Sequence, residues 1–85
     1  MTGVNDEFKV MYLCIIEEKV DSIRLLNNLV TEKVRLRDAT KDPVAIFELN
    51  HDIGFLAGYM KLLREQINFN RGILDEHAKR KSGGV

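Results

Sequence analysis

The sequence contains one cysteine, one proline and no tryptophan among its 85 residues. A single cysteine, Cys14, excludes an intramolecular disulfide and favours a reducing, cytoplasmic location. Because proline interrupts helices, its scarcity favours long uninterrupted ones. Charge of one sign is also lacking, since thirteen basic and thirteen acidic side chains cancel. No overall field therefore attracts the chain to nucleic acid or to an acidic membrane surface.

Long hydrophobic runs are absent as well. The run from Val10 to Ile16 has seven residues, whereas a membrane-spanning helix needs about 20. The residues before this run are acidic rather than basic, so we expect no signal peptide. Cys14 lies inside the run, and we expect it to be a small buried side chain.

Helical periodicity is what the sequence does contain, and it predicts a first helix over about 6–38. Either Asn5 or Asp6 can cap its start. Apolar residues recur at helical spacing, with a flanking row beside them. The main row is Phe8, Leu13, Ile16, Val20, Ile23, Val30 and Val34, and the flanking row is Tyr12, Ile15 and Leu26. Asn27 lies within the main row, so we expect it to be buried, level with Gly54, and to fix the register between helices.

Residues 39–42 form the predicted turn, and a second helix is predicted over about 43–79. Asp42 can cap this helix, with Pro43 at its first position. Steps of three and four residues then repeat over five heptads, as in a coiled-coil seam. The seam is Ile46, Leu49, Ile53, Leu56, Met60, Leu63, Ile67, Asn70, Leu74 and His77. Residues 80–85 are expected to be a loose tail.

Two long helices with a short turn predict an all-α fold, an antiparallel helical hairpin forming one domain over residues 1–85. The apolar arc of the second helix spans about 160° at 100° per residue, which is wider than one neighbouring helix can cover. We therefore expect a second copy of the chain to complete a four-helix bundle. The expected oligomer interface is Met11, Tyr12, Ile15, Leu26, Tyr59 and Ile73.

Gly54 and Gly58 lie one turn apart inside the second helix, where each glycine costs about 1 kcal/mol relative to alanine. Two interpretations are open. The glycines either form a shallow groove against which a partner backbone packs, or they are tolerated on a solvated face. The partner-binding residues predicted by the groove interpretation are Phe47, His51, Gly54, Phe55, Gly58, Leu62 and Phe69.

Catalytic and cofactor-binding patterns are lacking. We find no nucleophile with a base at recognisable spacing and no glycine-rich phosphate loop before a helix, so neither an enzyme nor a cofactor is expected. Glu48 and His51 have the spacing used by ferritin-like metal-binding bundles, with Glu17 or Glu18 as the required partner glutamate. All of these residues fall on polar sides of their helices, so the metal-binding bundle is a lesser alternative.

A nucleic-acid-binding four-helix dimer is a further alternative, because basic residues gather at both ends of the expected hairpin. These are Lys33, Arg35, Arg37 and Lys41 near the turn and Lys79, Arg80 and Lys81 near the end of the second helix. Interleaved acids and the lack of aromatic residues for base stacking weigh against it. The favoured function is a non-enzymatic protein–protein interaction module. It would be a small dimeric bundle acting as an adaptor, inhibitor or regulatory subunit, of the kind found among bacterial or phage accessory proteins.

Overall fold

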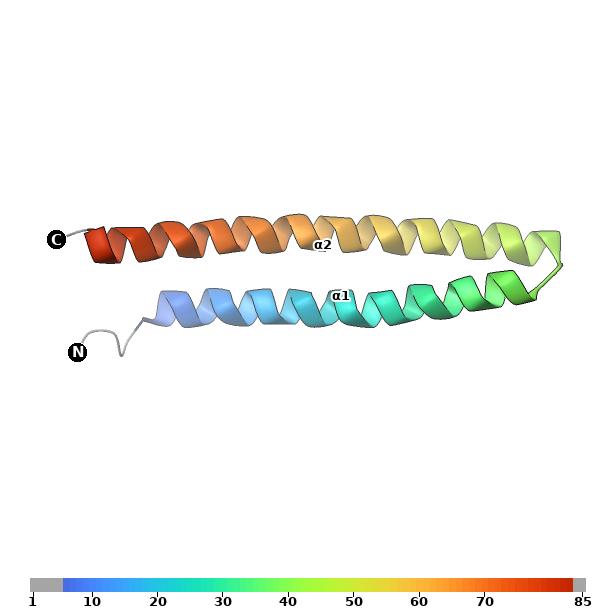
Figure 1. Ribbon diagram of the computed structural model, residues 1–85, viewed down its shortest axis with the longest axis horizontal. Coiled ribbons are helices and arrows are strands. Elements are labelled where there is room, and N and C mark those ends of the chain that lie inside the picture. The colour runs from blue at the N-terminus through green and yellow to red at the C-terminus, as the bar shows by residue number, and fades with distance from the viewer. Residues whose placement is uncertain (1–5, 84–85) are drawn as a thin grey trace.

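The structure, a computed structural model, describes residues 6–83. It contains two helices, α1 (Glu7–Ala39) and α2 (Pro43–Gly83), joined by residues 40–42. The helices run antiparallel, with the start of α1 and the end of α2 at the end opposite the turn (Figure 1). The molecule measures 65 × 17 × 12 Å. The predicted all-α helical hairpin is therefore confirmed.

Side-chain caps begin both helices where the sequence places them. The Asp6 carboxylate accepts a hydrogen bond from the backbone N–H of Lys9 at 3.1 Å. The Asp42 carboxylate accepts a hydrogen bond from the backbone N–H of Val44 at 3.1 Å. Pro43, between these two residues, has no backbone N–H and so needs no acceptor. Each contact satisfies an amide that the first helical turn leaves unpaired. Asn5, the other predicted cap, lies outside the described residues.

The end of α2 differs from its prediction. We predicted a loose tail from residue 80, but the helix continues to Gly83. Lys81 contributes to this extension, since its ammonium binds Asp6 across the open end of the hairpin at 3.0 Å. A contact between residues so distant in the sequence leaves no signal in the local helical pattern.

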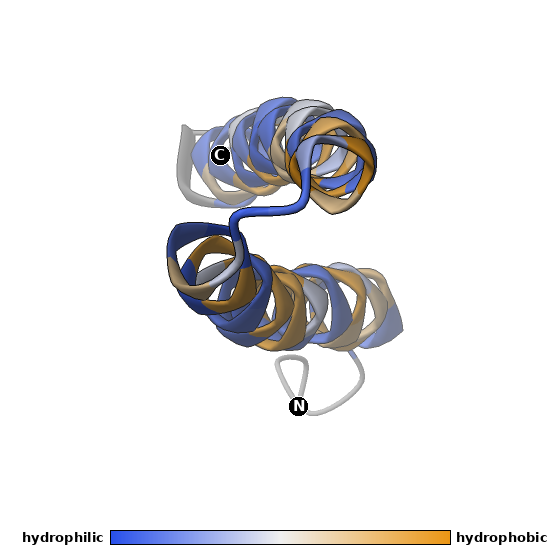
Figure 2. Ribbon diagram, turned by 90° about the vertical axis from the view of Figure 1, so that its right-hand side faces the viewer, coloured by the Kyte–Doolittle hydropathy of each residue, from blue (hydrophilic) through white to orange (hydrophobic). Residues whose placement is uncertain are grey.

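The predicted seam of α2 faces α1. Every one of its ten residues is buried or half-buried. Met60, Leu63 and Ile67 are the most shielded, and Ile16 of α1 joins them to complete the described core. This core lies between the middle of the hairpin and its open end. The segment that connects the two helices is hydrophilic, whereas hydrophobic residues recur along both helices (Figure 2).

The seam of α1 agrees with its prediction in part. Five residues of the predicted main row are buried or half-buried, namely Ile16, Val20, Ile23, Val30 and Val34, as are Tyr12, Ile15 and Leu26 of the flanking row. The side chains toward α2 follow steps of three and four along Tyr12, Ile16, Lys19, Ile23, Leu26, Val30, Lys33 and Arg37. Leu13 and Phe8 of the predicted row are exposed instead, as is Cys14. The predicted burial of Asn27 is also wrong, because this residue is exposed. Three basic residues enter the seam because their aliphatic stems pack while their charged tips reach polar partners.

Contacts made by two of these basic side chains show the register of α1 against α2. Lys19 donates to the Gln66 side-chain oxygen at 2.9 Å, and Lys33 to the Asp52 carboxylate at 3.1 Å. Asn27 lies eight residues after Lys19, and Gly58 eight residues before Gln66. Asn27 is thus level with Gly58, not with Gly54 as predicted. The two lysine contacts show this register, and Asn27, which is exposed, does not hold it.

Candidate interaction surface

Both helices carry a second apolar row beside the seam. In each helix the residues of this row, apart from Phe8 at the open end, immediately precede seam residues in the sequence, as Leu62 precedes Leu63 and Leu25 precedes Leu26. We call the two rows together the apolar face. Its members are Phe8, Met11, Ile15, Leu25, Leu29 and Leu36 on α1, and Phe55, Tyr59, Leu62, Phe69 and Ile73 on α2.

The two rows lie on one side of the hairpin. A step of one residue turns a helix by about 100°. Because α1 and α2 are antiparallel, a step back along each turns both rows toward the same side. The packing agrees, since Ile15 of α1 lines one groove with Leu62 and Phe69 of α2. Nearer the open end, Phe8 and Ile73 line another depression.

This face is exposed. Of the thirteen large apolar side chains that are exposed among the described residues, nine belong to it. Leu25, Phe55 and Phe69 are each 70 % or 71 % accessible. Exposed apolar surface of this kind makes the face the candidate interaction surface of the hairpin.

The angle between seam and face suits a bundle. Each helix has one apolar row toward its hairpin partner and another about 100° away. In a square four-helix bundle, each helix contacts two neighbouring helices, and the directions to these two neighbours are nearly at right angles. The geometry therefore fits two further helices packed against this face.

The predicted oligomer interface divides between two surfaces. Met11, Ile15, Tyr59 and Ile73 lie on the apolar face. Tyr12 and Leu26 were also assigned to the interface, but both are half-buried in the seam against α2. The two residues stand one position after face residues Met11 and Leu25, which turns them toward α2.

The predicted partner-binding residues divide in the same way. Phe55, Leu62 and Phe69 belong to the apolar face, whereas Phe47, His51, Gly54 and Gly58 are exposed elsewhere on α2. A Cβ atom added to Gly54, Gly58 or Gly72 would meet nothing within 4 Å. No close approach within the hairpin therefore requires glycine at these positions.

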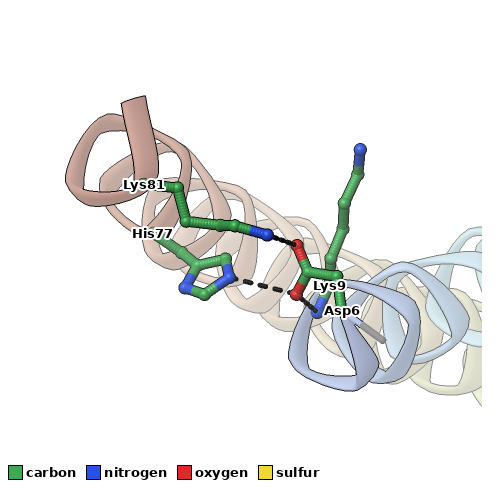
Figure 3. Close-up of polar contacts among 4 residues, drawn as sticks. All are labelled: Asp6, Lys9, His77 and Lys81. Atoms are coloured by element: carbon green, nitrogen blue, oxygen red, sulfur yellow. Dashed lines mark hydrogen bonds and ion pairs between the residues drawn. The ribbon is translucent and has the colours of Figure 1, made fainter. Parts of the chain in front are cut away.

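Polar contacts close the open end of the hairpin. The Asp6 carboxylate lies between the two helices and binds three groups (Figure 3). These are the Lys9 backbone N–H at 3.1 Å, the Lys81 ammonium at 3.0 Å and the His77 Nε2 at 3.1 Å. Phe8 stacks beside His77, with ring centroids 4.4 Å apart. The cluster thus ties the first turn of α1 to the last turns of α2.

The same contacts shift the titration of Asp6. Hydrogen bonds from Lys81, and then from the Lys9 amide, favour the charged carboxylate and lower its pKa from 3.8 to about 2. A lowered folded-state pKa means that Asp6 stabilises the fold at pH values above its unfolded pKa. This contribution is lost as the pH falls from about 3.8 through about 2.

We expect Asp6→Asn to remove this part of the acid sensitivity. Asparagine can still cap the helix but carries no charge for Lys81 or His77. The stability difference between wild type and variant should therefore be clear near neutral pH and shrink toward pH 2, measured by urea unfolding across that range. The control is Asp21→Asn, which removes a solvent-exposed pair with Arg24 and should leave the pH profile unchanged. A constant difference between wild type and Asp6→Asn at all pH values would contradict the role of the charge.

Basic side chains near the turn are already engaged within the hairpin. Lys33 binds Asp52, and Arg37 donates to the Asn50 side chain at 2.9 Å. Arg35 pairs with Glu32. Three of the four basic residues of the predicted turn patch, together with Lys81 of the patch at the open end, thus bind partners within the hairpin.

The predicted metal-site residues lie on the surface of the hairpin. Glu48 and His51, like Glu17 and Glu18, are exposed. Within residues 6–83 no group of three or more histidine, cysteine or acidic residues is placed to hold a metal ion. Neither α1 nor α2, within these residues, has a segment apolar and long enough to cross a membrane.

Comparisons with protein-family models, with curated proteins and with solved structures found no match.

Proposed function

We propose that this protein is a non-enzymatic protein–protein interaction module whose apolar face packs against helices of another polypeptide. The observation that carries the proposal is the concentration of exposed apolar side chains on one side of both helices. Covering such surface is favourable by roughly 25 cal/mol per Å². In this role the protein acts as an adaptor, inhibitor or regulatory subunit within a helical bundle, in the cytoplasm.

The size of the core supports the proposal. Only Ile16, Met60, Leu63 and Ile67 are buried among the described apolar residues, although the helices have 33 and 41 residues. A small domain has a total stability of only about 5–15 kcal/mol. Association through the apolar face adds buried surface that the hairpin lacks.

The test compares two phenylalanines of equal exposure on different sides of α2. Phe69, on the apolar face, is 70 % accessible, and Phe47, off that face, is 72 % accessible. Replacing either by lysine should leave the helical content of the hairpin intact. We expect Phe69→Lys to abolish association with protein and Phe47→Lys to retain it. The measurements are solution mass of the purified chain and recovery of bound protein from native lysate.

Two other outcomes would change or overturn the proposal. Loss of association with Phe47→Lys alone would move the binding surface to the glycine side of α2. A wild-type chain that is monomeric at micromolar concentration and retains no protein would overturn the proposed function.

A further inference from the structure

We propose that a second copy of this chain covers the apolar face, with its turn at the opposite end of the resulting four-helix bundle. This inference rests on the proposed function and names the partner of that same face. The arrangement has a two-fold axis perpendicular to the helices, so α1 packs on α1 and α2 on α2 of the second copy.

The shape of the face specifies what can cover it. The face follows two antiparallel helices, from Phe8 and Ile73 near the open end to Leu36 and Phe55 nearer the turn. Its occupant must present two long helices, side by side at the same spacing, each with an apolar row of three- and four-residue steps. A second copy of the hairpin provides these features, and two identical faces bury each other.

The rows of both helices are symmetric about nearly the same level. On α1, Phe8 and Leu36 lie fourteen residues either side of Ser22, and Ile15 and Leu29 lie seven either side. On α2, the corresponding centre is Arg64. Phe55 and Ile73 lie nine residues from it, and Tyr59 and Phe69 lie five.

These two centres meet across the hairpin. The Lys19–Gln66 contact places Arg64, two residues before Gln66, level with the residue two after Lys19, which is Asp21. Asp21 is one residue from the α1 centre at Ser22. A two-fold axis at this level maps four of the six α1 face residues and four of the five α2 face residues onto one another, while Met11, Leu25 and Leu62 come level with Lys33, Lys19 and Gln66 of the second copy. An isologous dimer requires self-matching of this kind.

The residues at the ends of the apolar rows favour the arrangement in which the turns of the two copies lie at opposite ends of the bundle. With turns at opposite ends, Phe8 faces Leu36 of the second copy. Glu48 and Arg80 lie sixteen residues either side of Arg64, and both are exposed. Glu48 of each copy therefore faces Arg80 of the other copy and forms an ion pair with it. With turns at the same end, Phe8 would meet Glu76, which already lines the same depression, and Leu36 would lie beside Glu48.

Asp52 and Glu76 lie twelve residues either side of Arg64, so they also face each other in the proposed dimer. Two acids at this position repel. Lys33 offsets the charge of Asp52 at 3.1 Å within each hairpin. The repulsion between Asp52 and Glu76 is therefore weaker than the sequence alone suggests. Glu48 and Arg80 form no ion pair within the described hairpin, so no such pair competes with the proposed one.

A charge exchange tests the arrangement. Glu48→Arg and Arg80→Glu should each weaken the dimer, by about two- to fivefold in dissociation constant for each ion pair lost. The double variant should restore wild-type affinity. These two residues lie near opposite ends of α2 and are too far apart to interact within one chain, so restoration requires contact between copies with opposed turns. Sedimentation equilibrium at micromolar concentration measures each constant.

Spin labels provide an independent reading. Lys41 is exposed in the turn, and Lys41→Cys in a Cys14→Ser background places one label on each copy. Opposed turns should give a label separation of about 60 Å, from roughly 1.5 Å per residue along the helices. Turns at the same end would give about 20 Å, from interaxial distances of roughly 8–10 Å.

The outcomes separate this inference from the proposed function. A dimer with the short label distance, or without restoration in the double variant, overturns the opposed arrangement but leaves the interaction module. A monomer that binds a different protein through Phe69 overturns the second copy as occupant, again leaving the module. A monomer that binds nothing overturns both.

Discussion

Replacing Leu63 by alanine should lower the free energy of unfolding by about 2–5 kcal/mol. Leu63 is 5 % accessible and lies between Met60 and Ile67, the other most buried residues of α2. The substitution removes apolar contacts and leaves a cavity that two straight helices close poorly, since each is held by its own backbone hydrogen bonds. A loss of this size is a large fraction of the stability of a small domain. Urea unfolding followed by circular dichroism measures it.

The matched control is Leu25→Ala, the same chemical change at a position 70 % accessible in the hairpin. In an isolated hairpin it should change stability by no more than about 0.5 kcal/mol. If the apolar face is covered, Leu25→Ala should cost much more, and its cost should depend on protein concentration. Equal, concentration-independent losses for the two variants would show that the core does not lie where the burial of Leu63 places it.

Replacing Gly54 and Gly58 together by alanine should raise the free energy of unfolding by about 1–2 kcal/mol. Both residues are helical and exposed, and an added Cβ atom meets nothing within 4 Å at either position. The gain comes from the smaller conformational entropy of the unfolded chain. Thermal unfolding should show a midpoint raised by several degrees.

The control for this prediction is the reverse change, Ala57→Gly, at an exposed position between the two glycines. It should destabilise the helix by an amount similar to the gain at either glycine. If the double alanine variant instead loses stability or changes its assembly state, another backbone packs closely against this side of α2. The glycines would then form the shallow groove for a partner backbone, which is one of the two interpretations of this sequence.

The α2 seam could be predicted because one apolar heptad pattern runs from Ile46 to Leu74, whereas the second apolar row of this helix begins only at Phe55. Leu56 also has Gly54 and Gly58 on the far side of the helix, which indicates the direction that faces α1. The caps at Asp6 and Asp42 were predictable for a similar reason, since capping depends on residues a few positions apart.

Only the apolar part of the α1 seam could be predicted. Apolar residues occupy several sides of this helix, so an average direction hides the true one. Lys19 and Lys33 face α2 because Gln66 and Asp52 receive their tips, and these partners are 47 and 19 residues away along the chain. Burial of a lysine stem leaves no hydrophobic signal, so the apolar pattern predicted neither lysine and included Asn27 and Leu13, which are exposed.

The position of the buried core has a consequence for how the chain folds. The buried residues Ile16, Met60, Leu63 and Ile67 lie many residues from the turn, whereas the seam next to the turn combines half-buried apolar residues with the stems of Lys33 and Arg37. A hairpin that closed progressively from its turn would therefore bury its most shielded side chains last. The search must instead bring distant segments together before much solvent is released, at the entropic cost of closing a long loop. Folding should therefore be all-or-none, with a rate limited by that encounter rather than by formation of the individual helices.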